Sequence, residues 1–234
     1  MELVDKNIKF TLDEKEINGL TGTRLDKIID IIAKSNKKIS YVDANCHDKF
    51  YEETLEEHLV EYMKVNEIYP KNLNKKIKDS LKIVALDEEL LERNIMTLSS
   101  SEKKKLLLAK ALLKNPDILI LKEPFRKLDM RNQKKLSMVL KRIKEKYQKV
   151  ILIISDNPNT LLKETNHLII FKNNKILCND NTMDFYKDVE SLKLHKIDIP
   201  DIIEITYLAN KKKNAKIDYF KDIRDIIKDI YKHV

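Results

Sequence analysis

Apolar residues along this 234-residue chain fall into two patterns, short unbroken runs and stretches with helical spacing. The unbroken runs are typical of parallel strands covered on both faces, and they lie at 117–121, 150–154 and 167–171. Apolar residues three and four apart predict amphipathic helices at 24–36 and at about 131–147. Strands that alternate with helices in this way predict an α/β protein with a mostly parallel sheet.

The sequence also predicts two strands near the N-terminus and a group of helices in the middle of the chain. Residues 7–12 alternate as a strand does, and residues 16–22 predict a short strand that runs into a turn. The pattern is helical from about 51 to 113, with candidate helices at 51–65, 72–86 and 99–114. We therefore predict a core domain over 1–184, which contains a helical subdomain at about 51–113, and a C-terminal helical extension over 185–234.

The C-terminal extension ends in an apolar stripe at helical spacing, which must be buried against something. The stripe consists of Ile217, Phe220, Ile223, Ile226, Ile227 and Ile230.

Composition narrows the class of protein. The net charge of +8 comes mostly from Lys, with only six Arg, and aromatic residues are not interleaved with the basic runs, so we expect no nucleic-acid partner. No apolar run approaches the length of a membrane span, and residues 1–10 lack the apolar core of a signal peptide, so we expect a cytoplasmic chain. Cys46, Cys178 and the five scattered His residues show no metal-ligand spacing, and no metal site is expected.

The two glycines of the chain, Gly19 and Gly22, lie three residues apart between a predicted strand and a predicted helix. A glycine-containing turn in that context is where P-loop proteins bind phosphate through backbone N–H groups. The candidate nucleotide-binding residues are accordingly Gly19, Thr21, Gly22, Thr23 and Arg24.

Longer motifs indicate a family. The stretch "TLSSSEKKKLLLAKALLKNPDILILKEPFRKLD" resembles the signature motif, its helix, the Walker B strand and the D-loop of ATP-binding-cassette (ABC) ATPases. The stretch "FYEETLEEHL" and the tail from "DVESLKLHK" onward narrow the resemblance to the ATP-binding subunits of energy-coupling-factor (ECF) importers. The resemblance covers most of the chain from Asn7 onward and depends on the joint order of the motifs.

The resemblance implies a P-loop NTPase (RecA-like) core with an inserted helical subdomain, an antiparallel β subdomain and C-terminal helices. Only Met1 to Lys6 precede the first expected strand, and the segment from Gly22 to Ala44 has room for little more than a helix and one strand. We therefore expect a reduced antiparallel subdomain that lacks most of the sheet covering adenine and ribose in the family.

The phosphate-binding loop departs from the family pattern. Arg24 stands where the third glycine belongs, Leu25 takes the Lys position and Asp26 takes the Ser/Thr position. Leu25 supplies no counter-charge and Asp26 adds negative charge beside a polyphosphate, so we expect no nucleotide at this chain's own loop. The glycines then serve a tight strand-to-helix turn; the alternative is that Arg24 substitutes for the missing lysine.

The metal-binding and catalytic positions depart as well. Lys122 stands where the family's Walker B strand has the Asp that holds Mg²⁺, and a Lys cannot ligate Mg²⁺. Glu123 keeps the position of the catalytic base, as a relic with no positioned metal or phosphate to act on. The Q-loop Gln position is Ala44, and the switch His position is Asp156.

Two motifs that face a partner's nucleotide in the family are partly kept. Ser99 is retained in the signature, Ser100 and Ser101 replace its glycines, and Asp129 keeps the D-loop Asp. The resemblance implies that these residues face the ATP of a partner subunit. The alternatives are a plain helix cap for the serines and a turn residue for Asp129.

An acidic stretch follows the Q-loop position, and the resemblance places the docking groove for a coupling helix of the membrane component there. Its candidate docking residues are Glu52, Glu53, Glu56 and Glu57. Charge complementarity with a basic coupling helix would determine the register of docking and the rate of association. The alternative is that these residues form a solvated helix face. The tail helices pack between ATPases in the family, and an intramolecular contact is the alternative.

We therefore predict a degenerate ABC subunit of an ECF-type importer, peripheral on the inner face of the cell membrane. Its partners would be an intact ABC ATPase, in a heterodimer, and a transmembrane coupling component. No cofactor is expected at its own site, and ATP with Mg²⁺ is a candidate only at a composite site with the partner. The alternatives are a soluble scaffold or regulatory pseudo-ATPase and a residual ATP-binding ATPase.

Overall fold

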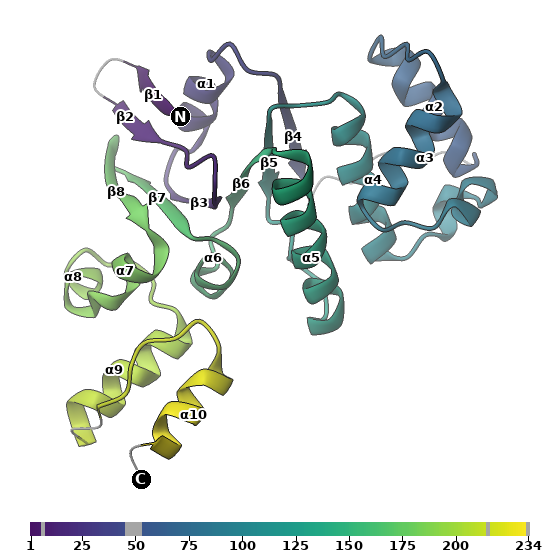
Figure 1. Cartoon of the computed structure of the whole chain (residues 1–234). Coiled ribbons are helices and arrows are strands. Elements are labelled where there is room, and N and C mark those ends of the chain that lie inside the picture. The colour runs from purple at the N-terminus through teal and green to yellow at the C-terminus, as the bar shows by residue number, and fades with distance from the viewer. Residues whose placement is uncertain (6–7, 45–52, 214–215, 233–234) are drawn as a thin grey trace. The chain divides into compact units, whose positions relative to one another are not determined.

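The computed structural model describes residues 1–5, 8–44, 53–213 and 216–232 of the chain. The chain divides into two compact units, the first formed by 1–32 and 153–234 and the second by 33–152. Figure 1 shows both, coloured from purple at the N-terminus to yellow at the C-terminus. The boundary expected after residue 184 falls inside the first unit and stays a prediction about domain organisation.

The first unit is built on strands in the order β3-β7-β8, and the unit boundary falls within β6. These strands span Val150–Ile154 (β6), Ile17–Gly22 (β3), His167–Lys172 (β7) and Lys175–Asn181 (β8). Strand β3 runs parallel to β7, and β7 pairs antiparallel with β8. The sequence analysis did not predict β8. Its turn is a recognisable signal, because Asn173 and Asn174 have φ of 53° and 59°, and asparagine tolerates the left-handed conformation that a two-residue hairpin requires.

The N-terminus forms a separate two-stranded antiparallel sheet of β1 (Glu2–Asp5) and β2 (Ile8–Thr11). The Met1 ammonium donates to the Leu12 carbonyl at 2.7 Å, and the Leu12 N–H donates to the Met1 carbonyl at 2.8 Å. The expectation that no strand precedes β2 was therefore wrong. The antiparallel part is still small, since this sheet has two strands of four residues each.

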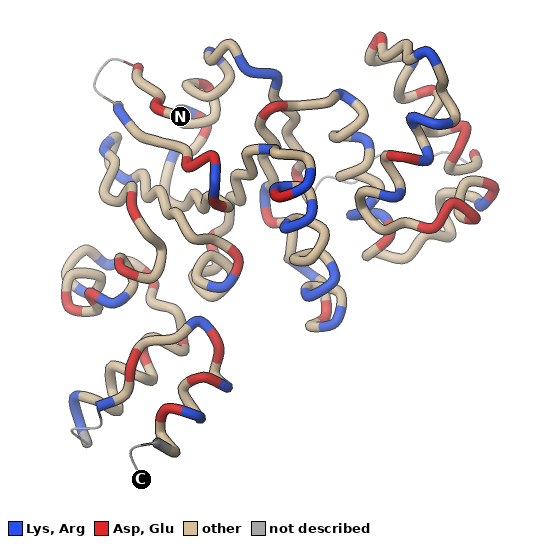
Figure 2. The backbone as a smooth tube through the Cα atoms, in the orientation of Figure 1, with Lys and Arg blue, Asp and Glu red and all other residues tan. Residues whose placement is uncertain are grey.

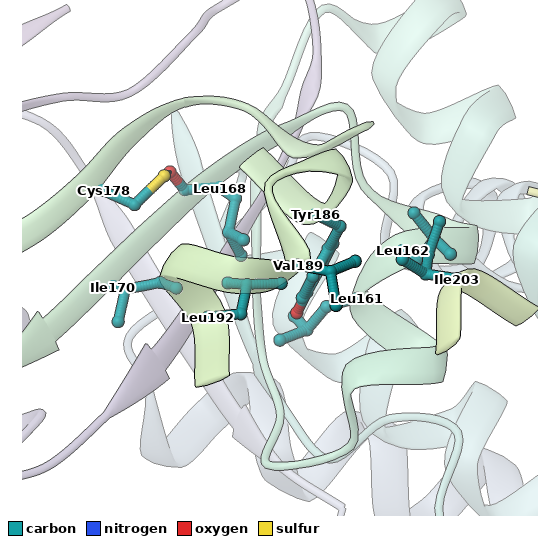
Figure 3. Packing of buried hydrophobic residues seen from close by; sticks show 9 residues of the cluster. All are labelled: Leu161, Leu162, Leu168, Ile170, Cys178, Tyr186, Val189, Leu192 and Ile203. Atoms are coloured by element: carbon teal, nitrogen blue, oxygen red, sulfur yellow. The ribbon is translucent and has the colours of Figure 1, made fainter. Parts of the chain in front are cut away.

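The helices of the first unit span Asp26–Ala33 (α1), Pro158–Glu164 (α6), Thr182–Lys187 (α7), Val189–Leu194 (α8), Asp201–Lys213 (α9) and Ile223–Lys232 (α10). Helices α6 to α9 contribute side chains to one apolar cluster beside β7 and β8. Figure 3 shows the cluster, with the Tyr186 ring among side chains from α6, α8 and α9. Its members are Leu161, Leu162, Leu168, Ile170, Cys178, Tyr186, Val189, Leu192 and Ile203. Burial raises the pKa of the Cys178 thiol to about 12, so this cysteine is an inert core residue.

Only part of the predicted C-terminal stripe is buried within the chain. Ile226 is buried, and the neighbouring Asp229 carboxylate accepts a hydrogen bond from the Asp218 N–H at 3.0 Å. Ile223, Ile227 and Ile230 are 51%, 45% and 39% exposed. The intramolecular alternative therefore holds for Ile226 of α10, and the other three residues stay exposed.

The second unit contains β4 (Ile39–Asp43) parallel to β5 (Ile118–Lys122). Its helices span Leu55–Val65 (α2), Leu73–Ile83 (α3), Ser100–Leu113 (α4) and Met130–Tyr147 (α5). Two short 3₁₀ helices, at Glu88–Glu92 and Ile95–Thr97, join α3 to α4. The helices predicted at 72–86, 99–114 and 131–147 are confirmed to within a few residues, as is the helix that ends at Val65.

Candidate functional site

The turn after β3 is where the sequence places a phosphate-binding loop, and the structure extends the strand through it. Gly19 lies opposite Leu168 and Gly22 opposite Phe171 in the ladder between β3 and β7. The backbone of β3 is therefore paired with β7 as far as Gly22. A phosphate cradle needs several unpaired N–H groups that converge on one point. Residues 19–22 provide no such arrangement.

Only three residues, Thr23, Arg24 and Leu25, separate β3 from α1. The Thr23 N–H donates to the Phe171 carbonyl at 2.8 Å, so the first of these residues still follows β7. Arg24 is exposed and takes a left-handed conformation with φ of 54°. Asp26 begins α1, where a carboxylate suits the positive end of the helix dipole and repels phosphate.

The two glycines are explained by packing. Gly22 has φ of +128°, and a Cβ there would lie 1.9 Å from the carbonyl oxygen of Phe171. A Cβ on Gly19 would meet Thr165 Oγ1 at 2.9 Å and Leu161 Cδ2 at 3.0 Å. Thr21, between them, is half-buried in the strand. Gly22 therefore allows the β3 backbone to approach β7, and Gly19 makes room for α6 and the turn that follows it.

Asp156, at the switch His position, is exposed just beyond β6 in the first unit. The preceding Ser155 is buried, and its N–H donates to the Leu20 carbonyl at 3.2 Å. The following Asn157 caps α6, its side chain accepting from the Asn159 and Thr160 N–H groups. The segment is held by strand and helix-cap contacts, and Asp156 places a carboxylate where the family has an imidazole.

The second unit contains the positions that would hold the metal. Lys122 ends β5 opposite Asp43, which ends β4, and their side chains form an ion pair with Nζ and Oδ2 3.1 Å apart. The Asp43 side chain is 15% exposed and the Lys122 side chain 45% exposed. The Ala44 N–H donates to the Lys122 carbonyl at 3.0 Å. An ammonium therefore occupies the carboxyl ends of these strands, where a divalent cation would need oxygen ligands.

Glu123 follows Lys122 in a left-handed conformation with φ of 49°, and it is partly buried. Lys104 of α4 interacts electrostatically with Glu123, and its Nζ donates to the Pro124 carbonyl at 3.1 Å and to the Arg126 carbonyl. Burial lowers the pKa of Lys104, and the charge of Glu123 opposes that shift. The Glu123 carboxylate thus lies at the start of a segment whose carbonyl groups accept hydrogen bonds from Lys104.

The signature and the D-loop position come together in the second unit, around a cavity of about 650 Å³. Its lining includes Ser99, Ser100, Ser101, Lys105, Lys127, Asp129 and Lys135. Burial and the nearby Lys135 lower the pKa of Lys105, whose Nζ donates to the Ala85 carbonyl at 2.8 Å. The sequence predicted that the two motifs act together, and it did not predict the three lysines.

The polar groups of these motifs already have partners within the chain. Ser99 caps α4 in a capping box: its hydroxyl accepts from the Glu102 N–H at 3.3 Å, and its N–H donates to the Glu102 carboxylate at 2.7 Å. Hydrogen bonds from the Ser99 side chain and backbone N–H to the Glu102 carboxylate lower the pKa of Glu102. Ser101 Oγ donates to Asn132 Oδ1 at 3.2 Å, and Asp129 caps α5 by accepting from the Asn132 N–H at 2.7 Å. The helix-cap and turn alternatives therefore both describe real contacts.

The acidic stretch is less available for docking than its sequence suggests. Glu57 forms a capping box with Thr54 at the start of α2, its Oε2 accepting from the Thr54 N–H at 2.8 Å. Glu53 Oε1 lies 2.6 Å from His58 Nδ1, and His58 Nε2 lies 3.1 Å from Lys110 Nζ. Glu56 is half-buried. Glu52 lies outside the described residues. The T-x-x-E spacing of 54–57 is a signal that sequence reasoning missed.

The phosphate-loop and metal positions of the family each have a different structure in this chain. In the first unit the phosphate-loop backbone is strand, and in the second an ammonium stands at the metal position. Across the described residues, no group of three or more His, Cys, Asp or Glu side chains could hold a metal ion. No helix in the described ranges is long and apolar enough to cross a bilayer.

Comparison with known proteins identifies the class. The family model of the ABC transporter matches residues 9–126, just over half of the chain, and the chain belongs to this family of ABC transporter ATPases. It is similar to the Energy-coupling factor transporter ATP-binding protein EcfA2 of Ligilactobacillus salivarius, with 25% identity over 207 residues covering 86% of this chain and 69% of the relative. The EcfA2 of Clostridium acetobutylicum is 22% identical over 220 residues, which cover 89% of this chain and 76% of the relative.

Solved structures show the same fold. CbiO1 from Clostridium perfringens, part of the ABC transporter complex cbiONQ, superposes with a TM-score of 0.68 at 16% identity, covering 86% of this chain and 91% of that one. A metal-chelate-type ABC transporter in an inward-facing conformation gives a TM-score of 0.67 at 16% identity, covering 80% of each chain. The expected α/β P-loop architecture with a mostly parallel sheet is thereby confirmed.

Proposed function

We propose that this chain is a non-hydrolysing ATP-binding-cassette subunit of an ECF-type importer. The observation that carries the proposal is the Lys122–Asp43 ion pair, with Nζ and Oδ2 3.1 Å apart at the metal-binding end of the Walker B strand. It is supported by the β3 ladder, which continues to Gly22 and leaves three residues for a phosphate loop. The names of the EcfA2 relatives supply the transporter class.

In this proposal the active ATPase is a partner subunit, in a heterodimer with this chain. The cavity lined by Ser99, Ser101 and Asp129 is the surface offered to the partner's nucleotide. Both glycines of the family signature are serines here, so side chains narrow the approach of a γ-phosphate, while Lys105 and Lys127 supply positive charge at the same cavity. ATP and Mg²⁺ then act at this composite site only.

The chain would work on the cytoplasmic side of the membrane, held to the inner face by a transmembrane coupling component. Helix α2 and the segment before it are the proposed docking region, of which Glu56 and Glu57 are described residues. The Glu57 carboxylate also accepts a hydrogen bond from the Thr54 N–H in the α2 cap. A coupling helix that bound Glu57 would therefore compete with this cap.

The test is ATP turnover by the chain combined with an intact ECF-type ATPase and the transmembrane component. Replacing the partner's catalytic Glu by Gln is expected to abolish turnover, and Glu123→Gln in this chain is expected to leave it unchanged. Turnover by the isolated chain that Glu123→Gln abolishes would instead establish a residual ATPase. A folded chain that fails to copurify with either component would favour the scaffold alternative.

A further inference from the structure

The positive charge of the chain is concentrated on one helix of the second unit. Helix α5 contains seven Lys and Arg residues and one Glu, for a net charge of +6, whereas the whole chain has a net charge of +8. Figure 2 shows the blue segments along this helix. The opposite face of α5 is apolar and buried, through Leu136, Val139, Leu140 and Ile143.

The exposed face has a definite pattern. Met138 is 55% exposed, and Lys134, Lys135, Lys141 and Arg142 lie three or four residues from it on either side. Residues at these spacings are neighbours on a helix surface, so an exposed apolar side chain is surrounded by four exposed cations. We call these five residues the α5 basic face.

Folding does not account for this face. Within the described part of the chain, Lys134, Lys135 and Lys141 form no ion pair, and Arg142 Nη1 donates to the Lys82 carbonyl at 3.4 Å. Like charges three and four residues apart, such as Arg131 with Lys134 and Lys135, lower helix stability. The face therefore costs stability in the isolated chain, and a polyanionic partner would remove that cost.

We propose that the α5 basic face binds an anionic lipid surface directly. Lysine ammonium groups on flexible stems suit a fluid layer of phosphate headgroups, and an exposed Met between them can enter the apolar boundary while the lysines stay at the headgroups. Specific nucleic-acid recognition relies instead on Arg forks and stacked aromatic rings, and this face has one Arg and no ring. The inference uses the proposed function only for location, since a subunit on the inner face of the membrane would meet such lipids.

The experiment measures cosedimentation of the full chain with vesicles of phosphatidylcholine mixed with phosphatidylglycerol, and with vesicles of phosphatidylcholine alone. We expect binding to the anionic vesicles only, weakened by added salt because the interaction is electrostatic. The quadruple variant Lys134→Gln, Lys135→Gln, Lys141→Gln, Arg142→Gln is expected to bind on the order of 1,000-fold more weakly, given four lost headgroup attractions. Met138→Ser, which keeps the charge, is expected to weaken binding by a smaller factor.

The matched control removes four exposed lysines elsewhere: Lys15→Gln, Lys37→Gln, Lys71→Gln, Lys75→Gln. It has the same net charge as the α5 variant, and we expect near-normal vesicle binding from it. Equal loss in both variants would show a non-specific charge effect and overturn the proposal. Absence of vesicle binding together with α5-dependent binding to a DNA duplex would overturn it in favour of nucleic acid. The assay needs no ATP or transporter subunit, so its failure is distinct from failure of the proposed function.

Discussion

Gly22 and Lys122 occupy positions that define a nucleotide site in the family, and both have a structural role here. Gly22 allows two strands to approach, because a Cβ would overlap the Phe171 carbonyl. Lys122 joins the ends of two parallel strands through Asp43. The sequence showed a retained glycine at position 22 and a changed residue at position 122, and it gave no indication of the structural partner of either.

Gly22→Ala is expected to lower the free energy of unfolding by at least ~2 kcal/mol. The new Cβ would combine a backbone clash at 1.9 Å with a φ of +128°, and neither is relieved by a side-chain rotation. Urea unfolding measures the change. Gly19→Ala is the matched control: its Cβ meets the ends of two side chains, so a loss of about 1 kcal/mol is expected. Equal losses in the two variants would refute the strand-approach role of Gly22.

The Lys122–Asp43 pair is expected to show a coupling energy of about 0.5–1 kcal/mol in a double-mutant cycle with Lys122→Met and Asp43→Asn. The value is modest because the Lys122 side chain is 45% exposed to solvent. The exposed Lys9–Glu2 pair serves as the comparison, and its coupling should be smaller. A cycle with no coupling at Lys122 and Asp43 would show that the ion pair does not fasten the two strand ends.

At the scale of elements, α4 shows how the signature is used within the chain. Its first turn is closed by the Ser99–Glu102 capping box, and α2 begins with the same device at Thr54 and Glu57. In both helices the Glu carboxylate at the third helical position accepts a hydrogen bond from the backbone N–H of the cap residue. The start of α4 is thus a complete helix cap without any bound nucleotide.

Ser99→Ala is expected to lower the free energy of unfolding by about 1 kcal/mol, since a side-chain acceptor for the α4 N-terminus is lost. Thermal unfolding followed by circular dichroism measures the change. Thr54→Ala removes the equivalent group from α2 and should cost a similar amount. Ser100→Ala, which alters no cap, should be close to neutral, and a larger loss from it than from Ser99→Ala would contradict the assignment of the cap.

The capping box also predicts a pH dependence. The pKa of Glu102 is below its usual value of 4.5 because Ser99 hydrogen-bonds its ionised form. Its stabilisation is therefore fully present above pH 4.5 and is lost as the pH falls through the lower pKa of the folded state. Glu102→Gln should flatten the acid side of the stability profile relative to the unmodified chain. An unchanged slope between pH 5 and pH 3 would show that Glu102 does not titrate with folding.

Sequence patterns predicted most elements of this fold, and the misses have physical reasons. Strands β5, β6 and β7 are unbroken apolar runs, and α5 has a regular apolar stripe, so each was predicted within a residue or two. The half-exposed strand β8 has polar residues at its end and no such run, and β1 is only four residues long. Contacts between residues distant in the sequence were harder to predict than the elements. Lys122 and Asp43 are far apart in sequence, and only the parallel register brings them together.

At the scale of the whole molecule, the proposed function is that of a cassette that keeps its fold and its partner-facing motifs and has lost its own nucleotide chemistry. Two separate features support it, the β3 ladder that continues to Gly22 and the Lys122–Asp43 ion pair. Under this proposal, restoring the P-loop position or the Walker B position alone would not restore the site. The central claim is that the chain's own site does not bind Mg-ATP.

Calorimetric titration of Mg-ATP into the isolated chain tests that claim most directly, with the EcfA2 protein of Ligilactobacillus salivarius as the positive control. The account predicts no saturable heat up to millimolar ATP for this chain. Saturable binding with a dissociation constant of ~10 μM, about −7 kcal/mol, would contradict it. In that case a group such as Arg24 would hold the phosphates, and Arg24→Ala would abolish the heat.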